Sequence, residues 1–479
     1  MGAVPQLSDG PTAEPGYFLA DDFYDEAFDA PGVPRADYLE LLAALAQTDL
    51  AGLATAISEE VERLGVSFGF GASAQAFHVD PVPRVFAASE WELVERALAQ
   101  RVRALRSFIA DVYGARSIVS AGVVPERAIE TSRYFEPWMI GVQVPAWSYL
   151  PVAGMDLVRG ADGRLWILED NLRTPSGFAY ASAARTAVDP HLPLPAPADR
   201  RPFEAAYDTL GAALRSASPR ADGDPYVVLL SDGPSNSAWY EHRLLAERLE
   251  IHLATPDDLY PSRGRLRVLG ETTSREVDVV YRRTDEDRLH DDQSRPTWVA
   301  EVLLDPCRSG RLACVNAFGS GVADDKLVHA YVEAMVRFYL HEEPLIPSVP
   351  THDVGVPSVR DSILSRMDEV VVKPRAGHGG HGIVVGPHAN AADLERTALR
   401  IEADPGTWVA QETVLLSRHP TVDGHALSPR HVDLRAFAIS AGDDVEVAAG
   451  GLTRFGRDPG ALVVNSSQNG GGKDTWVLG

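Results

Sequence analysis

The chain of 479 residues carries 68 acidic and 44 basic side chains, a formal net charge of −24, and 45% of its residues are hydrophobic. This composition is typical of a globular protein with two or three domains, and its acidic surplus argues against nucleic acid as a partner because like charges repel. No apolar run approaches the roughly 20 residues of a membrane span, and the first residues lack a secretory signal pattern. The two cysteines, Cys307 and Cys314, predict neither a zinc site nor a disulfide framework. We therefore expect a cytoplasmic protein that does not contact a membrane.

Residues 1–130 are expected to form an N-terminal arm followed by a helical region. Apolar residues recur at spacings of three and four between Leu98 and Val112, which predicts an amphipathic helix packed on the core. The segment Ser89 to Glu92 resembles a capping box at the start of this helix.

A β-hairpin is predicted within the next segment, residues 131–190. Short apolar runs flank the turn Ala161-Asp-Gly163. The turn would bring Asp156 beside Glu169 and Asn171, which lie two apart on one strand and therefore face the same side. Two carboxylates and an amide at the end of two strands suit Mg²⁺, although solvated polar residues at a strand end give the same pattern.

A β-α-β unit is predicted after a proline-rich linker. Residues 225–231 read as a buried strand, 237–250 as a helix and 251–256 as the next strand. Residues 220–320 are therefore expected to form a Rossmann-like domain. Asn236, at the first strand-to-helix turn, could meet a substrate or could cap the helix.

The stretch VVKPRAGHGGHGIVV (371–385) packs glycines closely behind Lys373. A dinucleotide-binding fingerprint and a P-loop both continue into a helix, and the P-loop lysine follows its glycines. In this chain a predicted strand follows the glycines, and Lys373 precedes them. The pattern favours a β-hairpin whose tip presents backbone N–H groups to phosphates, with a mobile hairpin that binds nothing as the alternative. The glycines of the tip are Gly377, Gly379, Gly380 and Gly382.

His378 and His381 flank these glycines. They could be metal ligands, but two histidines without a third placed ligand do not define a site. We interpret them as exposed loop residues.

The spacing of these motifs resembles that of the ATP-grasp carboxylate–amine ligases. Lys326 precedes a predicted helix and lies 47 residues before Lys373, as the two lysines of that superfamily do. Gln411 lies in TWVAQETV, which is similar to the strand that binds adenine. Asp433 and Arg435 in HVDLRAF match a D-[IL]-R strand that is expected next.

The last block of the superfamily comes first in this chain. Asp156 and Glu169 are 13 residues apart and Glu169 begins an E-x-N motif, as that block requires. A circular permutation explains the order, because joining the termini and cutting elsewhere preserves a site. The chain thus resembles the circularly permuted type 2 ATP-grasp family. One departure is Gly154, where ligases that add D-alanine often carry an arginine. Further strings that support the resemblance are AFHVDPVPRVF, LEDNLRTPSG, SGVADDKLV, SPRHVDLRAF, GGLTRF and LVVNSSQNGGGKDTWVL.

The resemblance implies an α/β (α+β) fold, namely a circularly permuted ATP-grasp fold with a Rossmann-like pre-ATP-grasp domain and an N-terminal helical region. Residues 131–190 would supply the permuted segment with the Mg²⁺ ligands, and 321–479 the nucleotide-binding segments, with a lid at about 365–420.

The resemblance also implies ATP and Mg²⁺ as cofactors and a ligase that converts a carboxylate to an acylphosphate and then to an amide. Its substrates would be small-molecule or peptide carboxylates and amines, and a homo-oligomer is compatible with the sequence. An ATP-binding partner protein without turnover and a phosphotransferase that stops at phosphorylation are the alternatives. The implied metal ligands are Asp156, Glu169 and Asn171; the nucleotide-binding residues are Lys326, Lys373, the four glycines and Gln411; the catalytic candidates are Arg435, Arg454 and Lys473.

Overall fold

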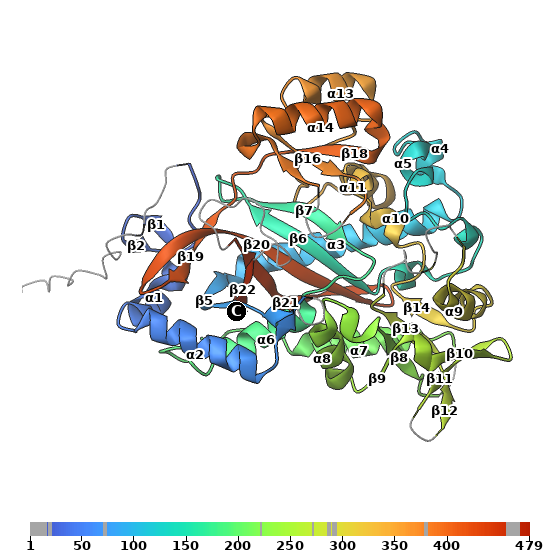
Figure 1. The fold of residues 1–479 in the computed structure, drawn as a ribbon, viewed down its shortest axis with the longest axis horizontal. Coiled ribbons are helices and arrows are strands. Elements are labelled where there is room, and N and C mark those ends of the chain that lie inside the picture. Colours follow the sequence, from blue (N-terminus) through green and yellow to red (C-terminus); the bar gives the residue numbers. More distant parts are fainter. Residues whose placement is uncertain are drawn as a thin grey trace, which may run out of the picture.

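The computed structural model describes residues 17, 22–69, 74–220, 223–270, 273–284, 289, 295–377, 382–456 and 470–479. Within these ranges the chain is a mixed α/β protein with a seven-stranded sheet, two four-stranded sheets, one of which carries its own pair of helices, and three sheets of two or three strands (Figure 1). No single described helix is long and apolar enough to cross a membrane, while one bent pair, Ala36–Leu45 with Leu50–Arg63, meets the test of length and composition.

The central sheet joins strands from both ends of the chain. Its order is β5-β22-β21-β20-β6-β7, and β19 pairs with β20 off this path. The hairpin predicted around residues 161–163 is confirmed as the antiparallel pair β6–β7, which forms one edge of the sheet beside the late strand β20. The strands are β5 (Val79–Phe86), β6 (Val152–Arg159), β7 (Leu165–Asn171), β19 (Arg418–Asp423), β20 (Ala426–Ala441), β21 (Asp444–Phe455) and β22 (Gly471–Val477).

A four-stranded sheet of order β15-β18-β16-β17 lies at the top of Figure 1 and contains the strands of the predicted lid, about 365–420; we use the name lid for this sheet with its two helices. Strands β16 and β17 are antiparallel, so the hairpin predicted on either side of the glycines is confirmed. Val370, Val372 and Trp408 pack on one face with the helices, and this leaves the alternate residues of the strands on the other face. The elements are β15 (Thr351–His352), β16 (Val370–Pro374), β17 (Val384–Val385), β18 (Trp408–Glu412), α13 (Pro357–Leu364) and α14 (Ala391–Ala403).

A second four-stranded sheet is parallel throughout, in the order β14-β13-β8-β9. The predicted β-α-β unit is present as β8, α8 and β9. Asn236 lies before the helix, where its Oδ1 accepts a hydrogen bond from the backbone of Ala238 at 2.9 Å. The N-cap residue of the helix is Ala238 and no side chain caps it, so this contact is a local turn ahead of the helix and does not confirm the capping interpretation. The elements are β8 (Val227–Leu230), α8 (Trp239–Arg248), β9 (His252–Ala254), β13 (Val279–Arg282) and β14 (Ala313–Val315).

The longest helix, α3 (Ala88–Val112), buries its apolar stripe in the main core, as its periodicity predicts. The predicted capping box is wrong. The helix begins at Ala88, its N-cap residue is Ala87, and no side chain caps it. Ser89 therefore lies inside the first turn rather than before it.

Candidate active site

The hairpin β6–β7 places the three predicted metal ligands on one face of the central sheet. Asp156 lies directly opposite Glu169, and Gly154 lies opposite Asn171. Opposed residues of an antiparallel pair share a face, and so do residues two apart. The structure therefore brings Asp156, Glu169 and Asn171 together.

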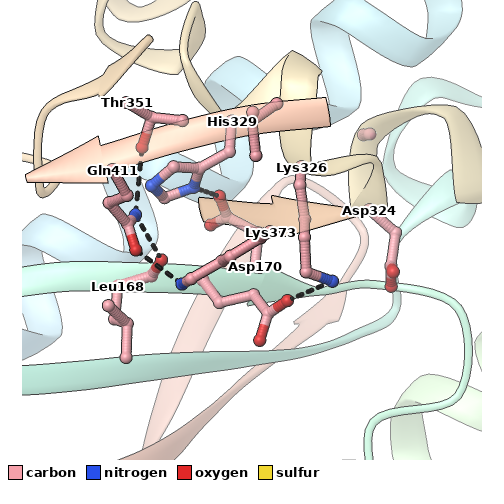
Figure 2. A pocket seen from close by; sticks show the side chains of 11 residues that line it. Leu168, Asp170, Asp324, Lys326, His329, Thr351, Lys373 and Gln411 are labelled. Carbon is pink, nitrogen blue, oxygen red and sulfur yellow. Dashed lines mark hydrogen bonds and ion pairs between the residues drawn. The ribbon is translucent and has the colours of Figure 1, made fainter. Parts of the chain in front are cut away.

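A pocket between β7 and the lid is lined by Glu169 and by three further polar side chains, those of Lys326, Lys373 and Gln411 (Figure 2). The Nζ of Lys326 lies 2.8 Å from a Glu169 carboxylate oxygen and donates to the carbonyl of Gly377 at 3.0 Å. The Nζ of Lys373 donates to Oε1 of Gln411 at 2.5 Å. The lysines reach the pocket from two different elements, α11 (Lys326–His329) and β16.

Gln411 is fixed by two more contacts. Its Nε2 donates to Oγ1 of Thr351 at 3.0 Å and to the carbonyl of Leu168 at 3.3 Å. Both the lid and β7 thus determine its orientation, and the glutamine joins them across the pocket (Figure 2).

The charges of the pocket perturb one another. Burial lowers the pKa of Lys373 to about 8, although the Glu169 carboxylate opposes this shift. Burial would raise the pKa of Glu169, but Lys326 and Lys373 hold it below its ordinary value. Burial would lower the pKa of Lys326, and the pairing with Glu169 raises it instead. A buried lysine whose charge is only partly compensated is an attractive contact for an anion such as a phosphate.

Asp156 is held by both predicted catalytic arginines. Arg435 binds its two oxygens at 2.7 and 2.8 Å, and Arg454 lies 2.9 Å away while also binding Asp433 at 2.8 and 2.6 Å. Burial would raise the pKa of Asp156, but the two guanidinium groups hold it well below its usual range. The structure brings these arginines to the site as partners of a predicted metal ligand.

The position of Gly154 has no room for a side chain. A Cβ atom there would lie only 2.8 Å from Cβ of Pro175, whereas its distance of 3.6 Å from Cδ of Arg435 is an ordinary contact. The close approach of Pro175 therefore requires glycine at this position.

The donor set fits Mg²⁺ in part. Asn171 has a buried Nδ2 with no hydrogen-bond partner among the described residues, which as a donor suits a phosphate oxygen, whereas its Oδ1 is the atom that could bind a metal. The Glu169 side chain is 30% exposed. Asp156 shares its oxygens with two arginines, so Glu169 and Asn171 are the better placed ligands. No group of three His, Cys, Asp or Glu side chains in the described ranges could hold a metal. Such a set suits Mg²⁺, which usually takes one or two carboxylates together with substrate phosphates.

Lys473 is not brought to the site. Its position on β22 opposes Thr453 on β21, whereas Arg454 opposes Gly472, so Lys473 points to the other face of the sheet. There it pairs with Asp80 and donates to the carbonyl of Pro420 at 3.1 Å, with no part of its side chain exposed. Burial lowers the pKa of Lys473 to about 8 despite the pairing.

We expect Lys473→Met to destabilise the protein by about 3–5 kcal/mol, because Asp80 would remain buried without its cation. Chemical denaturation measures this loss. ATP binding by the folded variant should equal that of the wild type. A variant of full stability that has lost turnover would instead restore the catalytic interpretation of Lys473.

The glycine loop is described only at its two ends. Gly377 and Gly382 have φ of +140° and +76°, a backbone region that favours glycine. The predictions for Gly379, Gly380, His378 and His381 lie outside the described residues.

Sequence reasoning missed Asp170, which anchors β7 to side chains on the face opposite Glu169. Asp170 lies between Glu169 and Asn171 and faces the opposite way, where it binds Nε of Arg101 at 2.6 Å and Nδ1 of His329 at 2.7 Å. Strand alternation contained the signal, because a charged residue that points into a core must be paired.

Sequence reasoning also missed Asp325 and Arg375, which form a buried ion pair of 2.6 Å between α11 and the base of the glycine hairpin. Asp325 directly precedes Lys326 in DDK, and Arg375 lies two residues after Lys373 in KPR. That proximity was the only available signal for them.

Comparison with known proteins gives the same family as the motifs. An uncharacterized protein of Mycobacterium tuberculosis is 39% identical over 97% of this chain and 86% of its own length. A protein of Frankia alni with the provisional name glutamate–cysteine ligase 2-3 is 38% identical over 95% of this chain, which spans 54% of that protein. The solved glutathione synthetase-like effector of Globodera pallida shares the fold, with a TM-score of 0.54 at 12% identity over 90% of this chain and 97% of its own. The family model "Circularly permuted ATP-grasp type 2" matches residues 83–456, and the chain belongs to this family.

Proposed function

We propose that the protein is an ATP-dependent carboxylate–amine ligase that acts through an acylphosphate. The observation that carries this proposal is the pocket itself, which Lys326, Lys373 and Gln411 line together with Glu169 of β7. Asn171 lies two residues after Glu169 on the same face of β7. Phosphoryl transfer needs mainly positioning and charge neutralisation, and this arrangement offers both.

Each group has a proposed role. Lys326 and Lys373 bind the α and β phosphates, Gln411 faces adenine, and the glycine hairpin covers the phosphates and excludes water that would hydrolyse an acylphosphate. Glu169 and Asn171, with Asp156 beside them, hold Mg²⁺, which neutralises phosphate charge when it is bound.

Arg435 and Arg454 are proposed to stabilise the charge that develops on the transferred phosphoryl group or on the carboxyl oxygen. They lie on the same face of the central sheet as Glu169, and their anchorage on Asp156 fixes their orientation. The attacking amine then displaces phosphate from the acylphosphate to form the amide.

The remaining regions have supporting roles in this proposal. We assign the parallel sheet of residues 220–320 to a Rossmann-like domain and residues 1–130 to an N-terminal helical region. The provisional name of the Frankia relatives supports a carboxylate–amine ligase, and it points to amino acids among the substrates. This chain spans about half the length of those relatives, at 54% and 53%.

A hydroxamate assay tests the proposal. The protein is incubated with Mg-ATP, hydroxylamine and pools of amino acids, peptides or other acids, and hydroxamate and ADP are measured. Hydroxylamine traps an acylphosphate, so a hydroxamate formed together with ADP in one pool identifies the acid. A phosphorylated product without hydroxamate would indicate a phosphotransferase. ATP binding without ADP release in any pool would indicate a binding protein.

A further inference from the structure

Three consecutive residues, from the end of α10 (Gly321–Asp324) to the start of α11, each contact a different part of the site. Asp324 accepts hydrogen bonds at 2.7 and 3.1 Å from two backbone N–H groups in the loop after β7. Asp325 binds Arg375 in the lid, and Lys326 binds Glu169 in the pocket. Residues 324–326 therefore form a junction between β7, the lid and the pocket.

Arg375 ties the base of the glycine hairpin to this junction. Its Nε donates to Oδ1 of Asp325 at 2.6 Å, Nη1 donates to Oγ1 of Thr131 at 2.6 Å, and Nη2 donates to the carbonyl of Ala128. Its own backbone N–H donates to the carbonyl of Thr407, at 2.8 Å, just before β18. Three acceptors outside the lid thus hold one side chain of the lid.

Asp325 is itself fixed by contacts outside the lid. Its Oδ2 accepts a hydrogen bond from the Ser132 hydroxyl at 2.6 Å, and its Oδ1 accepts one from the backbone of Leu327 at 2.9 Å, which caps α11. Asp325 is 1% exposed and Arg375 is 5% exposed. Water does not screen their attraction at this depth.

The ion pair connects the neighbours of the two lysines. Asp325 immediately precedes Lys326, and Arg375 lies two residues after Lys373 and two before Gly377. A guanidinium has its donors in a rigid planar fork, so three acceptors define its position and orientation closely. A lysine ammonium lies on a flexible stem and cannot hold a distance in this way.

We propose that Arg375 and Asp325 are positioning residues that set the separation of Lys326 and Lys373, and thereby the preference of the site for a nucleotide with several phosphates. The inference rests on the proposed function, in which both lysines bind phosphates of one ATP. Misplacement by about 1 Å can cost as much as about 100-fold in a site that depends on alignment. Loss of the pair should therefore weaken contacts to a triphosphate more than contacts to a monophosphate.

The test compares the binding of ATP and of AMP, each with Mg²⁺, to the full chain by calorimetry. We expect Arg375→Met and Asp325→Asn to raise the Kd of ATP about tenfold or more and that of AMP several-fold less. Arg375→Lys retains the charge but not the fork, and it should give an intermediate ATP affinity. Asparagine can still accept the bond from Leu327 through Oδ1, and its Nδ2 can donate to the Ser132 hydroxyl, so Asp325→Asn tests the loss of the charge if Arg375→Met does not fold.

A matched control is the remote ion pair of Arg84 and Glu26, which has two contacts of 2.7 Å and side chains 0% and 3% exposed. Arg84→Met should lower thermal stability without changing the ratio of ATP to AMP affinity. The proposal is overturned if Arg375→Met and Asp325→Asn bind ATP like the wild type, if both nucleotides weaken equally, or if Arg84→Met changes the ratio as well. A wild type that does not bind Mg-ATP would overturn the proposed function together with this inference.

Discussion

Replacement of Glu169 by glutamine should abolish ADP formation and leave the fold intact. Glutamine has the shape of glutamate but lacks the charge that pairs with Lys326 at 2.8 Å and that a magnesium ion would require. Substitution of groups that merely orient a metal ligand costs about 10- to 100-fold, so loss of a ligand itself should cost at least about 100-fold. ADP release in the presence of the acid identified by the hydroxamate assay measures the effect.

Glu90 offers a matched control for this substitution. Its side chain is 28% exposed, against 30% for Glu169, and it binds Arg159 at 2.6 and 3.0 Å away from the pocket. Glu90→Gln should keep full ADP formation. If Glu169→Gln is as active as Glu90→Gln, the metal-binding role of Glu169 is wrong.

The sequence was sufficient where local rules decide the geometry. A turn of Ala161-Asp-Gly163 between two apolar runs must fold Asp156 back toward Glu169, and the structure shows the two residues in register. Glycines bounded by two strands similarly predict a hairpin, and β16 and β17 pair as expected. These features depend on residues close together in the chain.

The sequence was insufficient where strand pairing decides the geometry. The family resemblance makes Lys473 a catalytic candidate, but its register with β21 turns it to the opposite face. A shift of one residue in a strand exchanges its two faces, and no local pattern fixes the register between β21 and β22. The pairing of Arg435 with Asp156 likewise depends on β20 lying beside β6.

The permuted order of the chain has a simple physical basis. The hairpin β6–β7 needs only to place β6 beside β20, and hydrogen bonds of a sheet do not depend on which strand comes first in the sequence. The site therefore survives the permutation because its parts meet in space. Because pairing in space does not depend on chain order, the order of motifs alone is a poor guide to whether such a site exists.

Replacement of Lys373 by methionine or alanine should abolish ADP formation and weaken ATP binding. The ammonium of Lys373 is buried and its pKa is lowered to about 8, so the folded protein holds it at a cost in stability. Methionine keeps the apolar stem and removes the charge. We therefore expect Lys373→Met to be at least as stable as the wild type to denaturant, while Lys373→Ala is less stable because it leaves a cavity.

Lys473 makes this prediction a double comparison, because burial lowers its pKa to about 8 as well. Lys373 donates to the neutral Gln411, whereas Lys473 pairs with the carboxylate of Asp80. Removal of the Lys473 charge leaves the buried carboxylate of Asp80 without its cation. Removal of the Lys373 charge leaves only the neutral Gln411 without its donor. Lys373→Met should thus lose ATP affinity but not stability, and Lys473→Met should lose stability but not ATP affinity. If Lys473→Met lost ATP affinity and Lys373→Met lost only stability, the nucleotide site would have to be assigned to the other face of the sheet.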